Sequence, residues 1–378
     1  MVFAAVLVGL EAIAVLRAVV RMVATAGGAA LRAGGAGTRD SVAVIVPVYN
    51  EEARLAPTLA SLAAVGPSVG EIAVVDGGSA DGTRGVVAAA AARDARIRWI
   101  DAGATPAGWN GKAWNLACGL RATTAPWVAT IDADVRVGAH TIDAAVLRAE
   151  RDGLVALSVA TRQELAGPPT ALLHPALLTT LVYRAGLPNV ASGDPLHVQA
   201  NGQVFVARRA ALDGADAFRA ARASRCEDVT TARVLAAAGG RVGFFEGDAV
   251  VRMHESARDC AANWPRSLTL RDAFVSPARM WTALAELVLA QALPLPTLLV
   301  LLAAGGTGPL ARAATAVAFA LVMVRLGVLA GTRRAYVRPS LAYWLSPLAD
   351  LPAVALLIAS AARRTHVWRG RTLVGERG

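Results

Sequence analysis

The amino-acid sequence predicts an α/β domain with a mostly parallel sheet, flanked by N-terminal and C-terminal transmembrane helices. Two observations support the sheet: short apolar runs alternate with longer, alanine-rich stretches from residue 41 onward, and polar residues follow the ends of those runs. A third supports the membrane segments, because 55% of the 378 residues are hydrophobic and residues 1–25 and 280–361 are apolar with few charges. We therefore expect a globular domain over residues 39–275 between membrane segments.

Residues 1–25 are predicted to form an uncleaved membrane anchor. A signal peptide begins with basic residues, whereas here Arg17 and Arg21 follow the apolar start, which Glu11 also interrupts. Because positively charged flanks stay on the cytoplasmic side, this order places the following domain in the cytoplasm. A signal peptide cleaved between residues 24 and 30 is the alternative.

Four apolar runs, at 42–48, 72–76, 97–100 and 128–131, predict buried strands. Each precedes a helix candidate, at 53–64, 83–93, 112–121 and 140–151 in turn. Continuous apolar runs are typical of a parallel sheet covered on both faces. Ligands of such sheets bind at the carboxyl ends of the strands. The polar residues found there, at 49–51, 76–81 and 132–134, are therefore the candidate site.

Beyond residue 150 the pattern is looser. Four prolines surround the apolar residues 172–183, which predict either a surface segment that touches the bilayer or a core helix. Polar residues gather again at 199–203, and Glu227 and Asp228 begin a helix that runs to Leu235.

The C-terminal region has three apolar stretches, at 282–304, 310–330 and 341–361, each close to the roughly 20 residues that a membrane span needs. Three full spans would place the basic tail, residues 362–378, outside the cell, against the positive-inside rule. Because the last stretch contains Pro347, Asp350 and Pro352, we expect it to be broken, re-entrant or interfacial. Pro294 and Pro296 make the first stretch the rival.

The formal charge of +10 favours anionic lipid headgroups as partners, and not nucleic acid, because the arginines cluster beside the apolar stretches. The three cysteines have no metal-binding spacing and are odd in number, which fits a reducing compartment.

The sequence Asp132-Ala133-Asp134 ends an apolar strand and predicts a metal site. Two carboxylates at this spacing can hold a divalent ion, Mg²⁺ or Mn²⁺, whose other positions take diphosphate oxygens. A solvated turn is the alternative. The sequence disfavours a dinucleotide-binding domain, because no Gly-x-Gly-x-x-Gly turn follows the first strand.

Five motifs in order resemble the family 2 glycosyltransferases over residues 41–270. They are Pro-Val-Tyr-Asn-Glu-Glu at 47–52, Asp-Gly-Gly-Ser at 76–79, Gly-Lys-Ala-Trp-Asn-Leu-Ala at 111–117, Asp-Ala-Asp at 132–134 and Glu-Asp at 227–228. The resemblance implies the GT-A fold, a Rossmann-like fold of nucleotide-diphospho-sugar transferases. It also implies that Tyr49, Glu51 and Asp76 hold the nucleobase and ribose, with Pro47 in the same motif, and that Asp132 and Asp134 bind the metal, Asp132 also contacting the donor.

The resemblance further implies that Lys112 lies near the diphosphate and that Asp228 is the general base, with Glu227 orienting or pairing beside it. A helix N-cap is the alternative for Asp228. A loop of three residues, Asn201, Gly202 and Gln203, would lie between donor sugar and acceptor.

Many family members have a Gln-x-x-Arg-Trp motif, for which this chain has Asn263-Trp264-Pro265-Arg266 followed by Ser267. Arg266 could still hold the leaving diphosphate. The departure argues against processive polymer synthesis and for transfer of a single sugar. The implied role of Asp228 as general base corresponds to transfer with inversion.

Residues 106–114, together with the terminal apolar segments, are similar to the hopene-associated and carotenoid-acid glycosyltransferase branch. This similarity implies lipid glycosylation: a UDP-sugar donor and an isoprenoid or polycyclic lipid acceptor at the cytoplasmic face of a multi-pass cell-membrane protein. Two alternatives remain open, a polyprenyl-phosphate sugar transferase and a non-catalytic membrane protein that binds a nucleotide-sugar.

Overall fold

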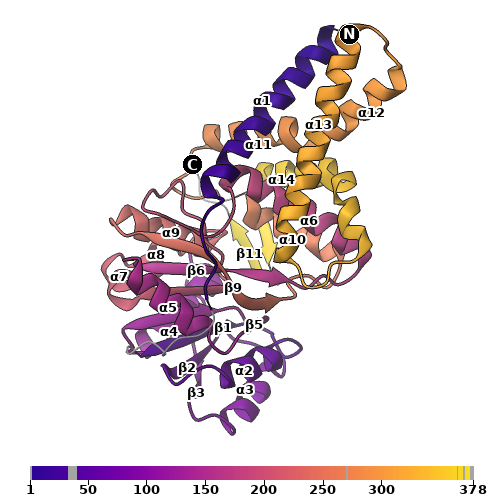
Figure 1. Ribbon diagram of the computed structural model, residues 1–378. Helices are drawn as coiled ribbons and strands as arrows, with labels where there is room; N and C mark the ends of the chain where they lie inside the picture. The colour runs from indigo at the N-terminus through magenta and orange to yellow at the C-terminus, as the bar shows by residue number, and fades with distance from the viewer. Residues whose placement is uncertain (1, 33–40, 270, 364, 369–370, 375–378) are drawn as a thin grey trace.

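The computed structural model describes residues 2–32, 41–269, 271–363, 365–368 and 371–374. Within them, one nine-stranded sheet has the strand order β3-β2-β1-β4-β8-β6-β9-β5, with β7 paired to β9 (Figure 1). Its strands are β1 (Val42–Val48), β2 (Val69–Asp76), β3 (Ile97–Asp101), β4 (Trp127–Ile131), β5 (Val135–Val137), β6 (Ala156–Gln163), β7 (Val190–Ser192), β8 (Val204–Arg208) and β9 (Val242–Val251).

The four predicted strands are confirmed as β1 to β4, and they pair in parallel. Strand β8 runs antiparallel to both β4 and β6, which the sequence did not predict, whereas β6 and β9 are parallel. All residues of β1 and β4 are buried, as expected for strands covered on both faces.

Helices cover both faces of this sheet. One face packs against α2 (Leu55–Ala63), α3 (Thr83–Ala91) and α5 (Thr141–Arg151), and the other against α4 (Gly111–Ala122), α8 (Ala217–Ala220) and α9 (Glu227–Ala237). A Cβ atom on Gly119 of α4 would lie 2.5 Å from Ile45 Cγ2, so glycine allows α4 to pack tightly on β1. The short α7 (Arg209–Gly214) follows β8.

A second layer, made of helices, packs against the sheet domain. Its core joins α6 (Pro168–Ala185) and α10 (Ala257–Leu268) of the sheet domain to α1 (Val2–Thr25), α11 (Pro277–Leu287), the π-helix η1 (Val288–Ala292), α13 (Pro309–Thr332) and α14 (Asp350–Ala362). The stretch around residues 172–183, for which two readings were open, is therefore a helix that packs between the sheet domain and the terminal helices.

Among the residues that the structure describes, three helices are long and apolar enough to cross a membrane: residues 2–25, 309–335 and 341–362. A fourth candidate is the pair Pro277–Ala292 and α12 (Pro294–Ala304), bent by 43° at the break before Pro294. Thus the first C-terminal stretch has a sharp bend, whereas in the last stretch a 3₁₀ helix η3 (Leu341–Ala349) continues into α14 at Asp350.

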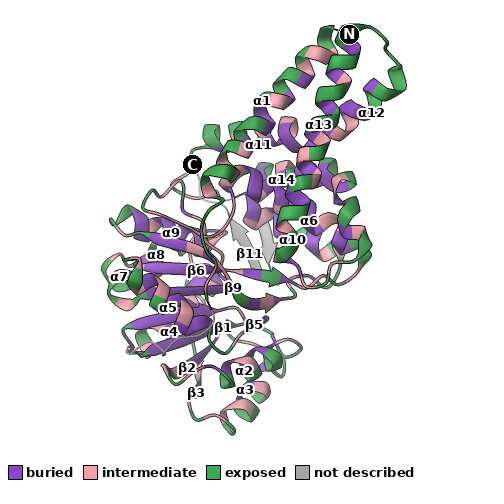
Figure 2. Cartoon of the chain, in the orientation of Figure 1, coloured by how far each residue is buried: buried purple, intermediate pink, exposed green. Residues whose placement is uncertain are grey.

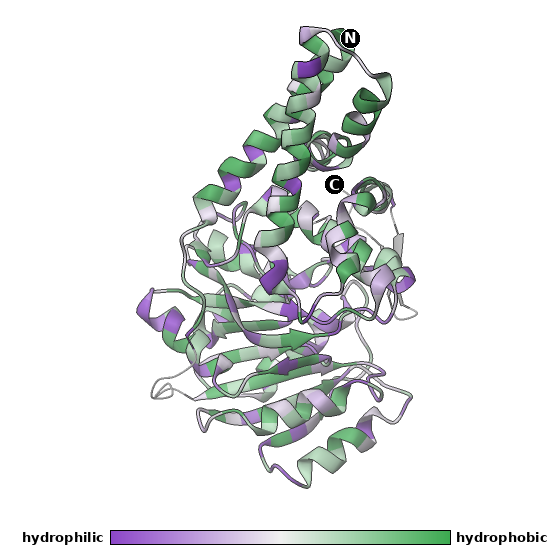
Figure 3. Ribbon diagram, turned by 45° about the vertical axis from the view of Figure 1, so that its right-hand side comes forward, coloured by the Kyte–Doolittle hydropathy of each residue, from purple (hydrophilic) through white to green (hydrophobic). Residues whose placement is uncertain are grey.

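Helices α1, α12 and α13 project away from the sheet, and their far ends pack together (Figure 1). Their outward faces are exposed and apolar, as the colours of Figures 2 and 3 show for α1 and α13. Such a surface is typical of helices that contact lipid.

The predicted basic tail, residues 362–378, includes a two-stranded antiparallel hairpin of β10 (Thr365–Trp368) and β11 (Arg371–Val374). Arg364 and Arg369 of that tail, Arg39 at the start of the predicted domain and Met1 of the predicted anchor lie outside the described residues.

Candidate active site

Lys112 lies at the centre of the candidate site. Its Nζ atom is 2.6 Å from Oδ1 of Asp132, at the end of β4, and 2.8 Å from Oε1 of Glu227, at the start of α9. A Cβ atom on Gly202 would lie 2.6 Å from the same Nζ and 3.1 Å from Oδ2 of Asp228. The structure thus brings together five residues from four segments that the sequence analysis singled out separately.

The two helices that supply Lys112 and Glu227 are joined at their N-terminal ends. Asn110 caps α4, because its Oδ1 accepts a hydrogen bond of 2.9 Å from the backbone N–H of Lys112. Its Nδ2 donates to the carbonyl oxygen of Ser224, at 3.0 Å, in the loop before α9. Helix N-termini carry partial positive charge, so this arrangement favours carboxylates and phosphate groups at the site.

Burial and ion pairing set the charges of this cluster. Burial raises the pKa of Asp132 to about 7, against the opposing effect of the Lys112 ammonium. For Glu227, burial acts to raise the pKa, but the Lys112 ammonium and its hydrogen bond hold it below its usual range. The Lys112 pKa stays well above its ordinary value despite burial, because Asp132, Glu227 and Asp228 surround it. The three acids therefore favour the charged form of Lys112.

Asp228 has the properties of a general base. Burial, followed by the charge of neighbouring Glu227, raises the pKa of Asp228, which makes its carboxylate a stronger proton acceptor. Its Oδ1 accepts hydrogen bonds from the Cys226 thiol, at 2.9 Å, and from the backbone N–H of Val229, at 2.8 Å. Its Oδ2 is the oxygen that lies against Gly202. Sequence reasoning missed Cys226, whose only signal was its place two residues before Asp228.

The loops after β1 and β2 form the other half of the site. The Asp76 carboxylate accepts hydrogen bonds from the backbone N–H groups of Gly78, at 3.1 Å, and Ser79, at 3.0 Å, so it closes its own turn. Gly78 has φ of 89°, which favours glycine. Asn50 joins the two loops, because its Oδ1 accepts from the N–H of Ala80 at 2.8 Å. Pro47 is buried inside β1, whereas Tyr49 is half-buried at its end.

Arg54 connects the predicted nucleotide-binding loop to the predicted metal site. Its guanidinium lies 2.9 Å from Oε2 of Glu51 and 3.5 Å from Oδ2 of Asp134. Burial raises the pKa of Glu51 to about 7, although Arg54 opposes this. Sequence reasoning missed Arg54, which its spacing of three residues from Glu51 could have indicated.

Asp132 and Asp134 fit a metal ion that shares its coordination with a ligand. Both carboxylates are half-buried, and partial desolvation raises the pKa of each in spite of the neighbouring cations. In the described part of the chain, no three His, Cys, Asp or Glu residues gather as a complete metal site. One or two carboxylates that leave positions for phosphate oxygens are the usual arrangement for Mg²⁺.

Of the predicted acceptor loop, Gly202 lies against the side chains of Lys112 and Asp228. The side-chain amide oxygen of Gln203 accepts a hydrogen bond from the Thr161 hydroxyl. The backbone carbonyl oxygen of Gln203 accepts one from the backbone N–H of Asp132 at 3.2 Å. The carbonyl oxygen of Asn201 accepts from the Ser158 hydroxyl at 2.9 Å. These bonds fix the loop on the sheet and hold Gly202 over Lys112.

Arg266, near the end of α10, is mostly buried and lies close enough to Glu227 and Asp228 for their charges to act on it. Burial lowers its pKa, and these acids, together with Cys226, oppose that shift. Residues 263–267 depart from the Gln-x-x-Arg-Trp motif, but they still provide an arginine close to the central cluster.

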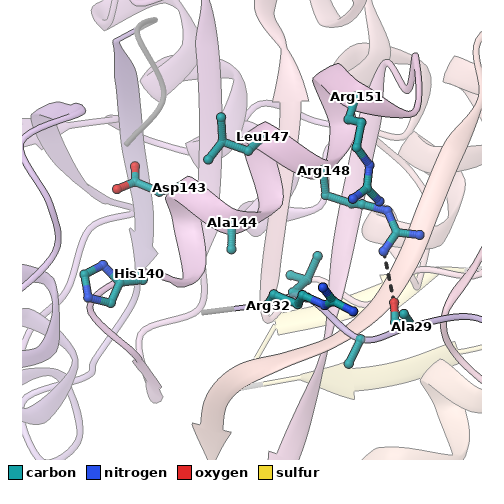
Figure 4. Close-up of a pocket in the computed structure, with 10 residues that line it drawn as sticks. Ala29, Arg32, His140, Asp143, Ala144, Leu147, Arg148 and Arg151 are labelled. Carbon is teal, nitrogen blue, oxygen red and sulfur yellow. Dashed lines mark hydrogen bonds between the residues drawn. The ribbon is translucent and has the colours of Figure 1, made fainter. Parts of the chain in front are cut away.

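A cavity of about 370 Å³ lies elsewhere, between residues 29–32 and α5. Figure 4 shows Arg32, Arg148 and Arg151 on it, with Arg148 donating a hydrogen bond to the carbonyl oxygen of Ala29 at 3.0 Å. None of the ten residues that line it belongs to the site described above.

Comparisons with known proteins concern the family and the fold of the chain. Residues 43–191 match the model of the family "Glycosyl transferase family 2". A mannosyltransferase, PcManGT from Pyrobaculum calidifontis, solved with GDP-Man and Mn²⁺, superposes with a TM-score of 0.56 at 21% identity, over 93% of this chain and 97% of that one. No curated protein sequence matches this chain.

Two further solved structures are less similar. They are glucosyl-3-phosphoglycerate synthase from Mycobacterium tuberculosis, with a TM-score of 0.40 at 19% identity over 61% of this chain and 78% of that one, and S. aureus TarS 1–349, with a TM-score of 0.41 at 16% identity over 88% and 96%. Residues 43–191 therefore resemble the family 2 glycosyltransferases, and the chain has the GT-A fold.

Proposed function

We propose that this protein transfers a single sugar, with inversion, from a UDP-sugar to a lipid or isoprenoid hydroxyl at the cytoplasmic face of the cell membrane. The observation that supports this most directly is the position of Lys112. It bonds to Asp132, of the predicted metal pair, and to Glu227, beside the predicted base Asp228. Lys112 therefore connects the residues proposed to bind the donor with those proposed to activate the acceptor.

The residues suggest the following division of work. Oδ2 of Asp228 takes the proton of the acceptor hydroxyl as its oxygen bonds to the anomeric carbon, and the bond from that carbon to the diphosphate breaks. Lys112 and Arg266 lie where they can stabilise the negative charge that leaves with the diphosphate. A divalent ion held by Asp132 and Asp134 would add to this stabilisation. Tyr49, Glu51 and Asp76 are proposed to hold the nucleoside.

The packing of the domain supports a lipid acceptor. Helix α10, which bears Arg266, shares one core with α1, α13 and α14. Arg225, two residues before Glu227, donates a hydrogen bond of 3.3 Å to the carbonyl oxygen of Arg363, just after α14. The candidate base thus lies next to the end of an apolar helix, where a lipid headgroup could reach it.

A polyprenyl-phosphate acceptor is the second candidate. Arg225, Arg266 and Arg271 lie close enough together for their positive charges to act on one another beside the site, and burial, followed by the charges of Arg271 and Arg266, lowers the pKa of Arg225. Clustered guanidinium groups are suited to a phosphate. The third hypothesis, a protein that binds nucleotide-sugar without chemistry, does not account for a carboxylate with a raised pKa at Asp228.

The test is a transfer assay with purified protein in detergent, Mn²⁺ or Mg²⁺, radiolabelled UDP-sugars and GDP-mannose, and extracted host lipids. We expect a labelled lipid product from the wild-type protein and none from Asp228→Asn, with donor affinity unchanged in that variant. A product that releases its sugar in mild acid would favour the phosphate acceptor. Equal turnover by Asp228→Asn would refute the assignment of the base.

A further inference from the structure

The last apolar segment, residues 341–362, is long and apolar enough to cross a membrane but differs from the other candidates. Half of its most apolar window is buried inside the protein, against 28% for residues 2–25 and 33% for residues 309–335. A helix that faces lipid on most sides would be less buried than this. The extra burial comes from the helices of the sheet domain, because α14 packs in one core with α6 and α10.

Both ends of the segment are attached to the sheet domain. Before it, the backbone N–H of Val337 donates to the carbonyl oxygen of Gln163, at the end of β6, at 2.9 Å. After it, the carbonyl oxygen of Arg363 accepts the hydrogen bond from Arg225 at 3.3 Å. Gln163 and Arg225 both belong to the domain that is built on the sheet.

The middle of the segment is attached as well. Asp350 forms a two-point ion pair with Arg325 of α13, at 2.8 and 2.9 Å, and accepts a hydrogen bond from Gln291 at 2.9 Å. Gln291 also donates to the carbonyl oxygen of Ala176 in α6, at 2.8 Å. Arg325, Asp350 and Gln291 are all almost completely buried. A polar link therefore runs from the centre of the segment to a helix of the sheet domain.

The two faces of the segment differ in chemistry. The inward stripe contains Tyr343, Ser346, Asp350, Ala353 and Leu357, all almost fully buried. The outward row is apolar and exposed: Leu341 85%, Trp344 40%, Leu345 55%, Leu348 62% and Leu351 51%. Exposed leucines in a row, next to helices that themselves expose apolar faces, fit lipid chains as the partner.

The segment, nine residues of 3₁₀ helix and 13 of α-helix, is about 37 Å long, more than the roughly 30 Å of the hydrocarbon core, so a crossing helix has its ends on opposite sides. Here the start, middle and end all contact one domain. We propose that residues 341–362 do not cross the bilayer but lie in the leaflet next to the sheet domain, with the row from Leu341 to Leu351 in contact with its lipid chains. This inference rests on the membrane location proposed above.

The chain then crosses three times, through α1, through α11 and α12, and through α13, so Arg363 at the end of the segment lies on the side of the sheet domain. With two C-terminal crossings instead of three, the basic tail is on the cytoplasmic side, as the positive-inside rule requires. Because the segment is followed by Arg363, whose carbonyl oxygen is bonded to Arg225, its C-terminal end lies close to the candidate base. An acceptor from that leaflet has the shortest path to the site.

Cysteine labelling in sealed vesicles of both orientations tests the inference. The variants are Arg93→Cys on the sheet domain, Gly306→Cys between α12 and α13, and Gly378→Cys at the C-terminus, each treated with a membrane-impermeant maleimide and read by peptide mass spectrometry. We expect the labels at positions 93 and 378 to appear in the same vesicles and the label at 306 in the opposite ones. If position 378 follows position 306, the segment crosses and the inference is wrong.

Spin labels at Leu341 and Leu351 provide a second measurement. In a crossing helix these positions differ in depth by about 19 Å, whereas we expect the two labels at nearly equal depth, close to the headgroups. Labelling at positions 93, 306 and 378 from both sides would show that the membrane location itself is wrong. The expected labelling without any transferase activity would instead contradict the proposed function alone.

Discussion

Replacing Lys112 with Met removes the only positive charge within 3 Å of both Asp132 and Glu227 among the described ion pairs. At an effective dielectric constant of about 20, each of these pairs amounts to about 6 kcal/mol of Coulomb energy before desolvation. The two acids can relax by taking up protons, so the net cost is smaller. Breaking a buried pair by removing one partner typically costs about 3–5 kcal/mol.

We therefore expect Lys112→Met to lower the melting temperature in detergent on the order of 10 °C at pH 8, since each kcal/mol corresponds to roughly 2–4 °C in a domain of this size. Without the ammonium, the pKa values of Asp132 and Glu227 rise. An acid whose folded-state pKa exceeds its unfolded value destabilises the fold when ionised, so stability returns as the pH falls. The loss should thus be smaller at pH 6 than at pH 8.

The assay is thermal unfolding at both pH values, together with titration of UDP in the presence of Mn²⁺. Arg93→Met, which removes an exposed cation at the end of α3, is the matched control and should change neither quantity. A Lys112→Met protein with wild-type stability at pH 8, or with the same loss at pH 6, would refute the reasoning that Lys112 compensates buried acids.

Three further predictions concern neighbouring residues. Gly202→Ala would place a Cβ atom 2.6 Å from Lys112 Nζ and should lower kcat at least tenfold. The control Gly214→Ala, where a Cβ atom would have no neighbour within 4 Å, should retain wild-type turnover. Equal kcat values for the two variants would contradict the close packing of the loop at residue 202. Cys226→Ala removes the hydrogen bond from the thiol to Asp228 and should lower kcat without changing the affinity for the nucleotide-sugar. Cys226→Ser should restore kcat. If serine does not restore kcat, the thiol acts through packing and not through its hydrogen bond. Burial raises the pKa of Glu51 to about 7, so its ionised form destabilises the fold and the free energy of unfolding of the wild-type protein should fall as the pH rises from 5 to 8. Glu51→Gln should reduce that fall by up to about 3 kcal/mol. An unchanged pH dependence of unfolding in the variant would show that ionised Glu51 does not destabilise the fold.

The candidate site illustrates how far local pattern extends. The apolar run of β4 predicted that Asp132 and Asp134 would lie at a strand end, and parallel pairing placed them at the same sheet edge as Asp76. Sequence spacing could not show that Arg54 bridges Glu51 and Asp134, because that contact depends on how α2 packs against the end of β4. It could not show either that the Asp76 carboxylate is used in its own turn.

By itself, the sequence determined what depends on neighbours along the chain: the β1–β4 strands from continuous apolar runs, the helices between them, the carboxylates at strand ends and the apolar terminal segments. Only the tertiary structure decided what depends on residues far apart in the chain: the antiparallel half of the sheet, the bonds of Lys112 to Asp132 and Glu227, and the attachment of residues 341–362 to Gln163, Ala176 and Arg225 through direct bonds and through Gln291. The physical reason is that hydropathy records how a segment prefers to be solvated, and both lipid and a protein core satisfy an apolar helix equally well. Which of the two surrounds it is settled by packing and by buried polar partners that local sequence does not specify.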